Sequence, residues 1–439
     1  MNRPIYEILR EFLRDDERLC VVKAPPGSGK SHNLIEALDA AVEDDYRIAI
    51  AAQTNNQVDD LCRKFCKRYP GQVIVRFSSA TYQRPEDLPA DVQIITDKKL
   101  LPGGPCIVVG TVAKLGLVDI ENLHDLLLID EAWQMTWADF LTLRDVAQRY
   151  VMIGDPGQIP PTVTIEVDRW EVSPVAPHAP APDVVLNNPE LRDIATVLEL
   201  DVCRRLPADS VALVRNFYDF HFDAHAGPGE RFLRPGKKLD MSRAIDRSVA
   251  LLGEHSTVIL THPTDEGGIP VDPDGELAEV VASVAVRLLE LGCVFSAGPD
   301  DVAQPRTLEP GHIGIVSTHN LMNSAIERAL PAKLRTPTGI KITTPERWQG
   351  LERPVMIAVH PLSGVTVPSS FDLETGRLCV MASRHQSACI FVSRDHVGET
   401  LDTHLPVADQ ALGRADIVGR GHKQHTDFWR HHAERNLIV

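Results

Sequence analysis

Long apolar runs are absent from this sequence. No stretch of the 439 residues approaches the ~18 to 20 consecutive apolar residues that a helix needs to span a bilayer. The first 19 residues are amphipathic and carry acids, so they lack the charged-then-apolar layout of a secretion signal. We therefore expect a cytoplasmic protein with no membrane partner.

Cysteine pairs of the metal-binding kind are missing as well. None of the eight cysteines forms a C-x-x-C pair. Cys62 and Cys66 are four apart on an expected helix, but no second pair completes a four-ligand set. Most of the others lie in apolar runs, where a thiol packs as core. The pattern argues against a zinc or iron–sulfur site and favours reduced, buried thiols.

The sequence also lacks an excess of basic charge. It has 45 basic and 61 acidic residues, for a formal net charge of −16. This balance argues against a protein whose whole surface coats nucleic acid. It does not exclude a local basic groove, because phosphate contacts are counted locally. Candidate patches lie at 63–68, 98–99 and 231–238, and each is equally well explained as solvated surface.

Two blocks of the chain alternate short apolar runs with helical patterns. We expect strands at 19–22, 47–51, 73–77, 106–110, 126–130 and 150–154 in the first block, and at 257–261, 312–317, 354–360 and 388–393 in the second. Near-continuous apolar strands separated by helices are typical of parallel sheets covered on both faces. The expected fold class is α/β, with two tandem parallel-sheet domains.

The expected domain organisation follows the changes in composition. The first domain covers 1–165, with a small insertion at about 68–105 that is rich in proline and turn residues. A proline-rich linker or strap covers 166–190, and the second domain covers 191–405. Residues 406–439 form a polar tail, whose histidines indicate an exposed basic helix rather than a metal site.

Residues 20–33, CVVKAPPGSGKSHN, run from an apolar strand through a glycine-rich turn into a helix. Such a turn points backbone N–H groups and a helix N-terminus at one spot, which favours phosphate. Lys30 is placed to reach the β- and γ-phosphates, and the Ser31 hydroxyl to bind Mg²⁺. Ala24 replaces the first glycine of the G-x-x-x-x-G-K-[ST] pattern, at a strand end where a methyl group is tolerable.

A second acidic element, LLLIDEAWQ at 126–134, is an apolar strand that ends in two carboxylates. Asp130 is placed to hold Mg²⁺ through water, and Glu131 to orient and deprotonate an attacking water. The alternative is that both acids only cap the next helix. This alternative is less convincing because a matching Lys-Ser pair lies one hundred residues upstream. Together the two elements predict a fold that hydrolyses ATP or GTP.

The motifs taken in order resemble those of superfamily-1 helicases, in the branch of the up-frameshift RNA helicase. The similar segments are APPGSGKS (24–31), QTNNQVDDL (53–61), GTVAKL (110–115), DEAWQ (130–134), GDPGQIPP (154–161), CRRLP (203–207), TTPERWQGLE (343–352) and RLCVMASRHQSACIFV (377–392). The resemblance covers nearly the whole chain. It implies two RecA-like domains, with the nucleotide in the cleft between them.

The resemblance also implies a role for each matching residue. The catalytic set is Lys30, Glu131, Gln158 as γ-phosphate sensor, Arg204 and Arg384 as arginine finger. The nucleotide-binding set is Ala24, Pro25, Pro26, Gly27, Ser28, Gly29, Lys30, Ser31, Gly350 and Glu352, and the metal-binding set is Ser31 and Asp130. The nucleic-acid-binding set is Thr54, Asn55, Asn56, Thr111, Thr318 and Thr344.

The implied function is an ATP- and Mg²⁺-dependent helicase or translocase that moves 5′-to-3′ on single-stranded DNA or RNA. The alternative is an ATPase that clamps and releases nucleic acid without unwinding it. The family usually has an adenine-reading glutamine before the first motif, but none precedes Ala24, so other nucleoside triphosphates stay open. Ser383-Arg384-His385 stands where Thr-Arg-Ala is usual. The accessory inserts are small, which suggests that a protein partner supplies targeting or strand separation.

Overall fold

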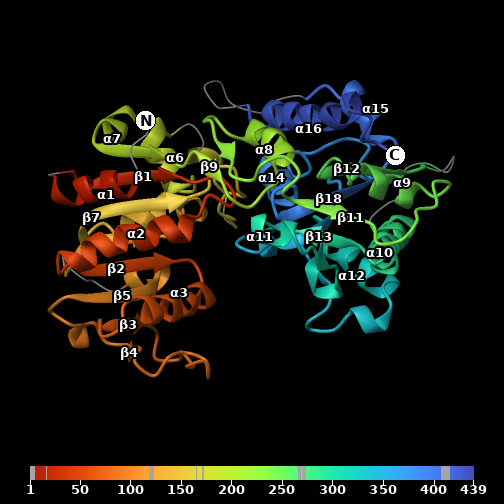
Figure 1. Cartoon of the computed structure of the whole chain (residues 1–439). Helices are drawn as coiled ribbons and strands as arrows, with labels where there is room; N and C mark the ends of the chain where they lie inside the picture. The colour runs from red at the N-terminus through yellow and green to blue at the C-terminus, as the bar shows by residue number, and fades with distance from the viewer. Residues whose placement is uncertain are drawn as a thin grey trace. The chain divides into compact units, whose positions relative to one another are not determined.

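The computed structural model describes residues 5–15, 17–117, 123–164, 166–170, 173–264, 268, 273–406 and 416–439. The chain divides into two compact units (Figure 1). Unit 1 comprises Met1–Pro25, Gly29–Pro156 and Pro160–Leu200; unit 2 comprises Asp201–Val439 with two short pieces, Pro26–Ser28 and Gly157–Ile159. Each unit is built on its own parallel sheet, as the sequence predicted.

The described residues of unit 1 form an eight-stranded parallel sheet in the order β4-β3-β5-β2-β6-β7-β1-β8. The strands are β1 (Leu19–Lys23), β2 (Arg47–Ala52), β3 (Ile74–Phe77), β4 (Gln93–Ile95), β5 (Cys106–Thr111), β6 (His124–Ile129), β7 (Ala147–Gly154) and β8 (Ala195–Glu199). The carboxyl ends of parallel strands share one edge. The segments that follow β1, β2, β5, β6 and β7, which carry the first five motifs, therefore meet at that edge.

Both faces of this sheet are buried. Successive residues of β1 show the alternation, since Cys20 and Val22 belong to one apolar cluster and Val21 belongs to the cluster on the other face. The helices of the first face are α1 (Ile5–Arg14), α2 (Lys30–Glu43) and α3 (Asn55–Arg68), and those of the second are α4 (Val112–Gly116), α5 (Trp137–Thr142) and α6 (Ala181–Asn187). This layering explains why the strands read as continuous apolar runs.

Of the two expected alternatives, a linker or a strap, the described residues between 173 and 190 form the strap. The backbone N–H of Trp137 donates to the carbonyl of Ala179 at 2.8 Å, and Trp133 Nε1 donates to Asp183 Oδ1 at 2.7 Å. After α6 and α7 (Pro189–Asp193), β8 pairs with β1 over five residues. Unit 1 therefore extends to Leu200 rather than ending at residue 165, because an ordered strap and an edge strand follow that point.

The described residues of unit 2 form a five-stranded parallel sheet in the order β12-β18-β17-β15-β16. The strands are β12 (Thr257–His262), β15 (Ile313–Val316), β16 (Lys341–Thr343), β17 (Arg353–Val359) and β18 (His385–Arg394). One apolar cluster packs this sheet against α9 (Ala244–Leu251), α10 (Gly275–Glu290) and α12 (Asn320–Ala329). A second cluster packs the other face against α8 (Ala208–Val214), α14 (Thr375–Ala382) and Phe428 of α16 (Ile417–Glu434).

Smaller elements complete unit 2. They are the two-stranded pair β9 (Val202–Cys203) and β10 (Asp223–Ala224), the antiparallel sheet of β11 (Phe232–Arg234), β13 (Val294–Ser296) and β14 (Arg306–Thr307), and the helices α11 (Pro299–Val302), α13 (Pro345–Trp348) and α15 (Val397–Thr403). Short 3₁₀ turns lie at Lys98–Leu100, Ala132–Gln134, Asp168–Trp170, Arg215–Phe217, Pro310–His312 and Ala332–Leu334. Among the helices described here, not one is long and apolar enough to cross a membrane.

The C-terminal segment is not the exposed polar tail that its composition suggested. In α16, His425, Phe428 and His432 are buried, and the residues after the helix hydrogen-bond to β12, with Ile259 N donating to the Leu437 carbonyl at 2.9 Å. The helix is polar overall because only one of its faces packs on the sheet. Within the described residues, no group of three or more His, Cys, Asp or Glu side chains is arranged to hold a metal ion.

Candidate functional site

The glycine-rich turn between β1 and α2 has the backbone of a phosphate loop. Gly27 and Gly29 have φ of 67° and 82°, the left-handed region that glycine adopts without strain. The carbonyl of Gly29 accepts the N–H groups of His32 and Asn33 at 2.8 and 3.0 Å, which closes the first turn of α2. The helix thus begins at Lys30, with the positive end of its dipole at the turn.

One polar atom in the loop fits a bound oxyanion. The Ser28 side chain is buried, and its Oγ has no hydrogen-bond partner among the described residues. A buried hydroxyl without a partner is costly, and an anionic oxygen would satisfy it. The side chain of Ser31, the predicted Mg²⁺ ligand, lies outside the part of the chain that the structure describes.

The two acids after β6 lie beside the loop lysine. Lys30 Nζ and Glu131 Oε2 are 3.2 Å apart, and both side chains are largely buried. Glu131 has φ of 51°, a left-handed conformation that is uncommon for a residue with a Cβ, and its N–H donates to Asp130 Oδ1 at 2.9 Å. The structure therefore brings Lys30, Asp130 and Glu131 together at the carboxyl edge of the sheet.

Asp130 is the most perturbed acid of this cluster. Burial and, to a smaller extent, the neighbouring charge of Glu131 together raise the pKa of Asp130 to about 6, although Lys30 acts in the opposite direction. A buried carboxyl beside another acid binds a cation readily, because the cation offsets both the burial and the repulsion. Asp130 therefore fits a divalent cation, and its binding of Mg²⁺ stays a prediction.

The segment after β7 carries the predicted γ-phosphate sensor. Gln158 and Asp155 are both buried at the end of this strand. A Cβ on Gly154 would lie 2.9 Å from the Ala132 nitrogen and from the Trp133 ring, so β7 and the turn after Glu131 approach too closely for a larger residue. The backbones that carry the two motifs are packed against each other.

The residues of unit 1 that were predicted to contact nucleic acid lie at the ends of β2 and β5, which pair in parallel. Thr54, Asn55 and Asn56 are exposed, and Thr111 is half-buried. The Thr54 hydroxyl accepts the N–H of Gln57 at 3.3 Å as the N-cap of α3, and Thr111 caps α4 in the same way. The structure brings the four residues to one edge, where both hydroxyls also have a structural role.

Sequence reasoning missed a buried charged group beneath Asn55. Arg76 of β3 is fully buried and donates to Asp59 Oδ1 at 2.9 Å and to Asn55 Oδ1 at 2.8 Å. Tyr82 donates to the same Asp59 oxygen at 2.7 Å. An arginine inside the apolar run VIVRF was the available signal, because a buried charge requires a partner.

In unit 2 the arginine beside the predicted one makes the ion pair. Arg204 is exposed, whereas Arg205 forms an ion pair with Glu352 and donates to the Ser383 carbonyl at 3.3 Å. Gln386 Nε2 donates to the other Glu352 oxygen at 2.7 Å. Burial alone would raise the pKa of Glu352, but Arg205, the hydrogen bond from Gln386 and the charge of Arg384 together outweigh burial and hold that pKa below its ordinary value.

The remaining predicted residues of unit 2 lie near strand ends. Thr318 and Thr344 follow β15 and β16, which pair in parallel, so both lie at one sheet edge. Thr344 is buried and Thr318 is half-buried. Gly350 has φ of 76°, a conformation that requires glycine or strain. Arg384, the predicted finger, is 1% exposed and stands immediately before β18.

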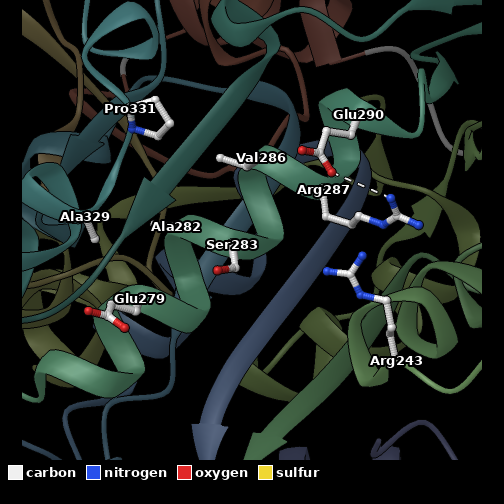
Figure 2. Close-up of a pocket in the computed structure, with 9 residues that line it drawn as sticks. All are labelled: Arg243, Glu279, Ala282, Ser283, Val286, Arg287, Glu290, Ala329 and Pro331. Carbon is white, nitrogen blue, oxygen red and sulfur yellow. Dashed lines mark ion pairs between the residues drawn. The ribbon is translucent and has the colours of Figure 1, made fainter. Parts of the chain in front are cut away.

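A separate hollow of about 390 Å³ lies on unit 2 beside α10. Arg243 and Arg287 lie on one side of it, with Glu279, Ser283 and Glu290 along the helix (Figure 2). Arg287 is 3.6 Å from Glu290 and forms a closer pair with the buried Asp246. The charges of this hollow are balanced, and it contains no motif residue, so it is not a candidate for the nucleotide.

Comparison with known proteins gives one match to a family model. A model described as an AAA domain matches residues 5–165. The comparison with curated proteins gives no match.

Several solved structures resemble the chain at low identity. Arterivirus nonstructural protein 10, a helicase, is 15% identical, with a TM-score of 0.44 over 87% of this chain and 61% of that one. The PRRSV helicase is 14% identical, with a TM-score of 0.42 over 89% of this chain and 55% of that one. A complex of the arterivirus protein with DNA is 18% identical, with a TM-score of 0.43 over 86% of this chain and 61% of that one. The chain thus spans less than two thirds of these proteins.

Proposed function

We propose that the protein is an NTP-hydrolysing motor of nucleic acid, a helicase or translocase that moves along single-stranded DNA or RNA. The observation that carries this proposal is the cluster of Lys30, Asp130 and Glu131 beside a phosphate-loop turn. A lysine, a cation-binding acid and a second acid that can activate water are the parts that phosphoanhydride hydrolysis requires. The match of residues 5–165 to the AAA domain model supports nucleotide use.

In this proposal the nucleotide is ATP with Mg²⁺, and other nucleoside triphosphates are also accepted. Asp130 and Ser31 would hold Mg²⁺, which would neutralise charge on the phosphates. Glu131 orients the attacking water and takes its proton, while Lys30 holds the β- and γ-phosphates and Gln158 senses the γ-phosphate. Arg384 supplies positive charge to the transition state. A second source of such charge is Arg204 or the neighbouring Arg205.

The proposed track is the phosphate backbone of a single strand. Thr54, Asn55, Asn56 and Thr111 in unit 1, and Thr318 and Thr344 in unit 2, are small polar residues at strand ends, which suits contacts to backbone rather than to bases. Binding of this kind tolerates sequence and weakens with salt. The motif resemblance supports 5′-to-3′ movement, and the small accessory inserts support a protein partner for targeting or strand separation.

Two measurements on the purified chain test the function and separate it from a clamp that does not unwind. We expect NTP turnover to rise about tenfold or more with single-stranded DNA or RNA, and a duplex with a single-stranded tail to be separated only when hydrolysable NTP is present. Stimulated turnover without strand separation, alone and with candidate partner proteins, would favour the clamp. NTP turnover that neither single-stranded DNA nor single-stranded RNA stimulates would refute the proposal that the protein is a motor.

A further inference from the structure

The chain just before and just after Arg384 contacts side chains from other segments of unit 2. The carbonyl of Ser383 accepts from Arg205 at 3.3 Å, and Gln386 donates to Glu352 at 2.7 Å. Arg384 itself is 1% exposed. The backbone around this arginine is therefore fixed, and the residue that remains to be explained is His385, which replaces the usual alanine.

His385 is completely buried and stands at one end of a chain of short hydrogen bonds. Its Nε2 is 2.6 Å from Ser210 Oγ, and Ser210 Oγ is 2.5 Å from Ser256 Oγ. Ser256 Oγ then donates to Asp209 Oδ1 at 2.6 Å, and the Ser256 N–H donates to Asp209 Oδ2 at 2.7 Å. Four side chains thus form one connected network from the surface to the interior.

The carboxylate of Asp209 sets the direction of every proton in this chain. An ionised carboxylate only accepts, so Ser256 donates to it. Ser256 Oγ must then accept a hydrogen bond from the Ser210 hydroxyl. Because the Ser210 proton is used in that bond, Ser210 Oγ must accept from His385 Nε2–H. His385 is therefore the tautomer protonated at Nε2, and its Nδ1 has no partner among the described residues. Hydrogen bonds aligned in this way strengthen one another.

The chain connects elements that carry the arginines of unit 2. Asp209 and Ser210 lie in the first turn of α8, which begins three residues after Arg205, and Ser256 stands immediately before β12. His385 opens β18, directly after Arg384. The chain therefore fixes the distance between the segment that contains Arg204 and Arg205 and the segment that contains Arg384.

We propose that His385 is a positioning residue, which holds Arg384 in its working place through Ser210, Ser256 and Asp209. The inference rests on the proposed function, because it takes Arg384 as the arginine of the hydrolytic step. In this proposal His385 acts through geometry alone and transfers no proton. Burial lowers the pKa of His385 to about 3 against the opposing charge of Asp209, so the ring stays neutral over the working pH range.

A double-mutant cycle between His385 and Arg384 tests this inference. We expect His385→Ala to lower the single-turnover rate of NTP hydrolysis by about tenfold to a hundredfold, the usual cost of a displacement of about 1 Å at a reacting centre. The KM for nucleotide should change by less than about twofold. In the Arg384→Ala background, His385→Ala should lower the rate by less than about twofold, because the guanidinium that His385 positions is then absent.

Further variants separate positioning from general support of the fold. His385→Gln keeps an N–H donor for Ser210, so we expect it to regain most of the rate, with the pH profile of the wild type. Ser210→Ala breaks the chain outside the motif and should reproduce the loss seen in His385→Ala, which keeps the test usable if that variant does not fold. Ser248→Ala is the matched control, since the hydroxyl of this buried serine of α9 bonds only the Ile245 carbonyl among the described residues.

The outcomes for the inference and for the proposed function are distinct. A loss that is equally large with and without Arg384 would overturn the positioning role, and so would a normal rate in both His385→Ala and Ser210→Ala. A shifted pH profile in His385→Gln would make His385 a proton-transfer group and would also overturn it. If the single variant Arg384→Ala keeps the wild-type rate, the role of Arg384 in the proposed function is refuted, and the inference about His385 is refuted with it.

Discussion

At the scale of single residues, Glu131 combines strain with an ion pair. Its left-handed backbone conformation costs on the order of 1 to 3 kcal/mol for a residue with a Cβ. The strain places the carboxylate 3.2 Å from Lys30 Nζ, at the edge of the sheet where phosphate is expected. Strain of this kind concentrates at working sites, because the surrounding packing must hold it.

Glu131→Gln tests this placement. We expect NTP turnover to fall by about a hundredfold or more, because an amide takes up no proton from the attacking water. Nucleotide affinity should be unchanged or higher, since Lys30 loses the carboxylate that competes with phosphate. The measurement is steady-state turnover together with equilibrium binding of a fluorescent nucleotide.

Glu199→Gln is the matched control for that variant. Glu199 of β8 also pairs with a lysine, Lys23 at the end of β1, at 3.2 Å. Unlike Glu131, Glu199 lies outside the motifs. We expect NTP turnover by the Glu199→Gln variant to equal that of the wild type. An equal fall in both variants would mean that the loss comes from a weakened sheet rather than from missing chemistry.

Motif spacing names some residues of the candidate site directly, whereas only the fold distinguishes others from their neighbours in the chain. Lys30, Asp130 and Glu131 follow from the motif spacing, and the structure brings them together. Arg204 and Arg205 are adjacent and chemically identical, and only the path of the chain after β9 decides which one reaches Glu352. His385 was visible as a departure, but its partners lie more than a hundred residues away.

At the scale of elements, the apolar strands were the easiest features to predict. Every strand expected from an apolar run is present, because strands covered on both faces need apolar residues throughout. The C-terminal helix was the hardest. Its polar sequence hid a buried face, in which His425 and His432 take the place that apolar residues usually fill.

The buried histidines make unit 2 sensitive to acid. Burial lowers the pKa of His425 to about 3 and that of His432 to about 4, and it holds the pKa of His360 well below the ordinary value. In the unfolded chain these rings titrate near pH 6.5, so the unfolded state binds more protons below that value. Stability is therefore complete above about pH 6.5 and is lost as pH falls toward 4.

Chemical unfolding at a series of pH values measures this effect. We expect the free energy of unfolding to fall by up to about 1.4 kcal/mol per pH unit for each buried histidine between pH 6 and pH 4.5. His425→Met should reduce that slope by about one proton, whatever its effect on stability at pH 7. The exposed His225→Asn is the control and should keep the wild-type slope. A slope that His425→Met does not change would contradict the account.

At the scale of the whole molecule, the boundary between the units was misplaced by the sequence. The proline-rich segment left a linker and a strap as alternatives; residues 177–183 form a strap on unit 1, and β8, which follows it, completes the sheet of that unit. Composition showed where the chain changes character and did not show where its contacts change. The two-sheet architecture was predicted correctly, because each sheet has its own set of apolar strands.

The central proposal is that Arg384 supplies charge to the hydrolytic step, and turnover by Arg384→Ala tests it most directly. The measurement is single-turnover NTP hydrolysis at saturating single-stranded polymer, with nucleotide binding followed in parallel. The account predicts that binding is kept while the hydrolysis rate falls by about a thousandfold or more, the usual contribution of such an arginine. An Arg384→Ala protein that hydrolyses NTP as fast as the wild type would contradict the account.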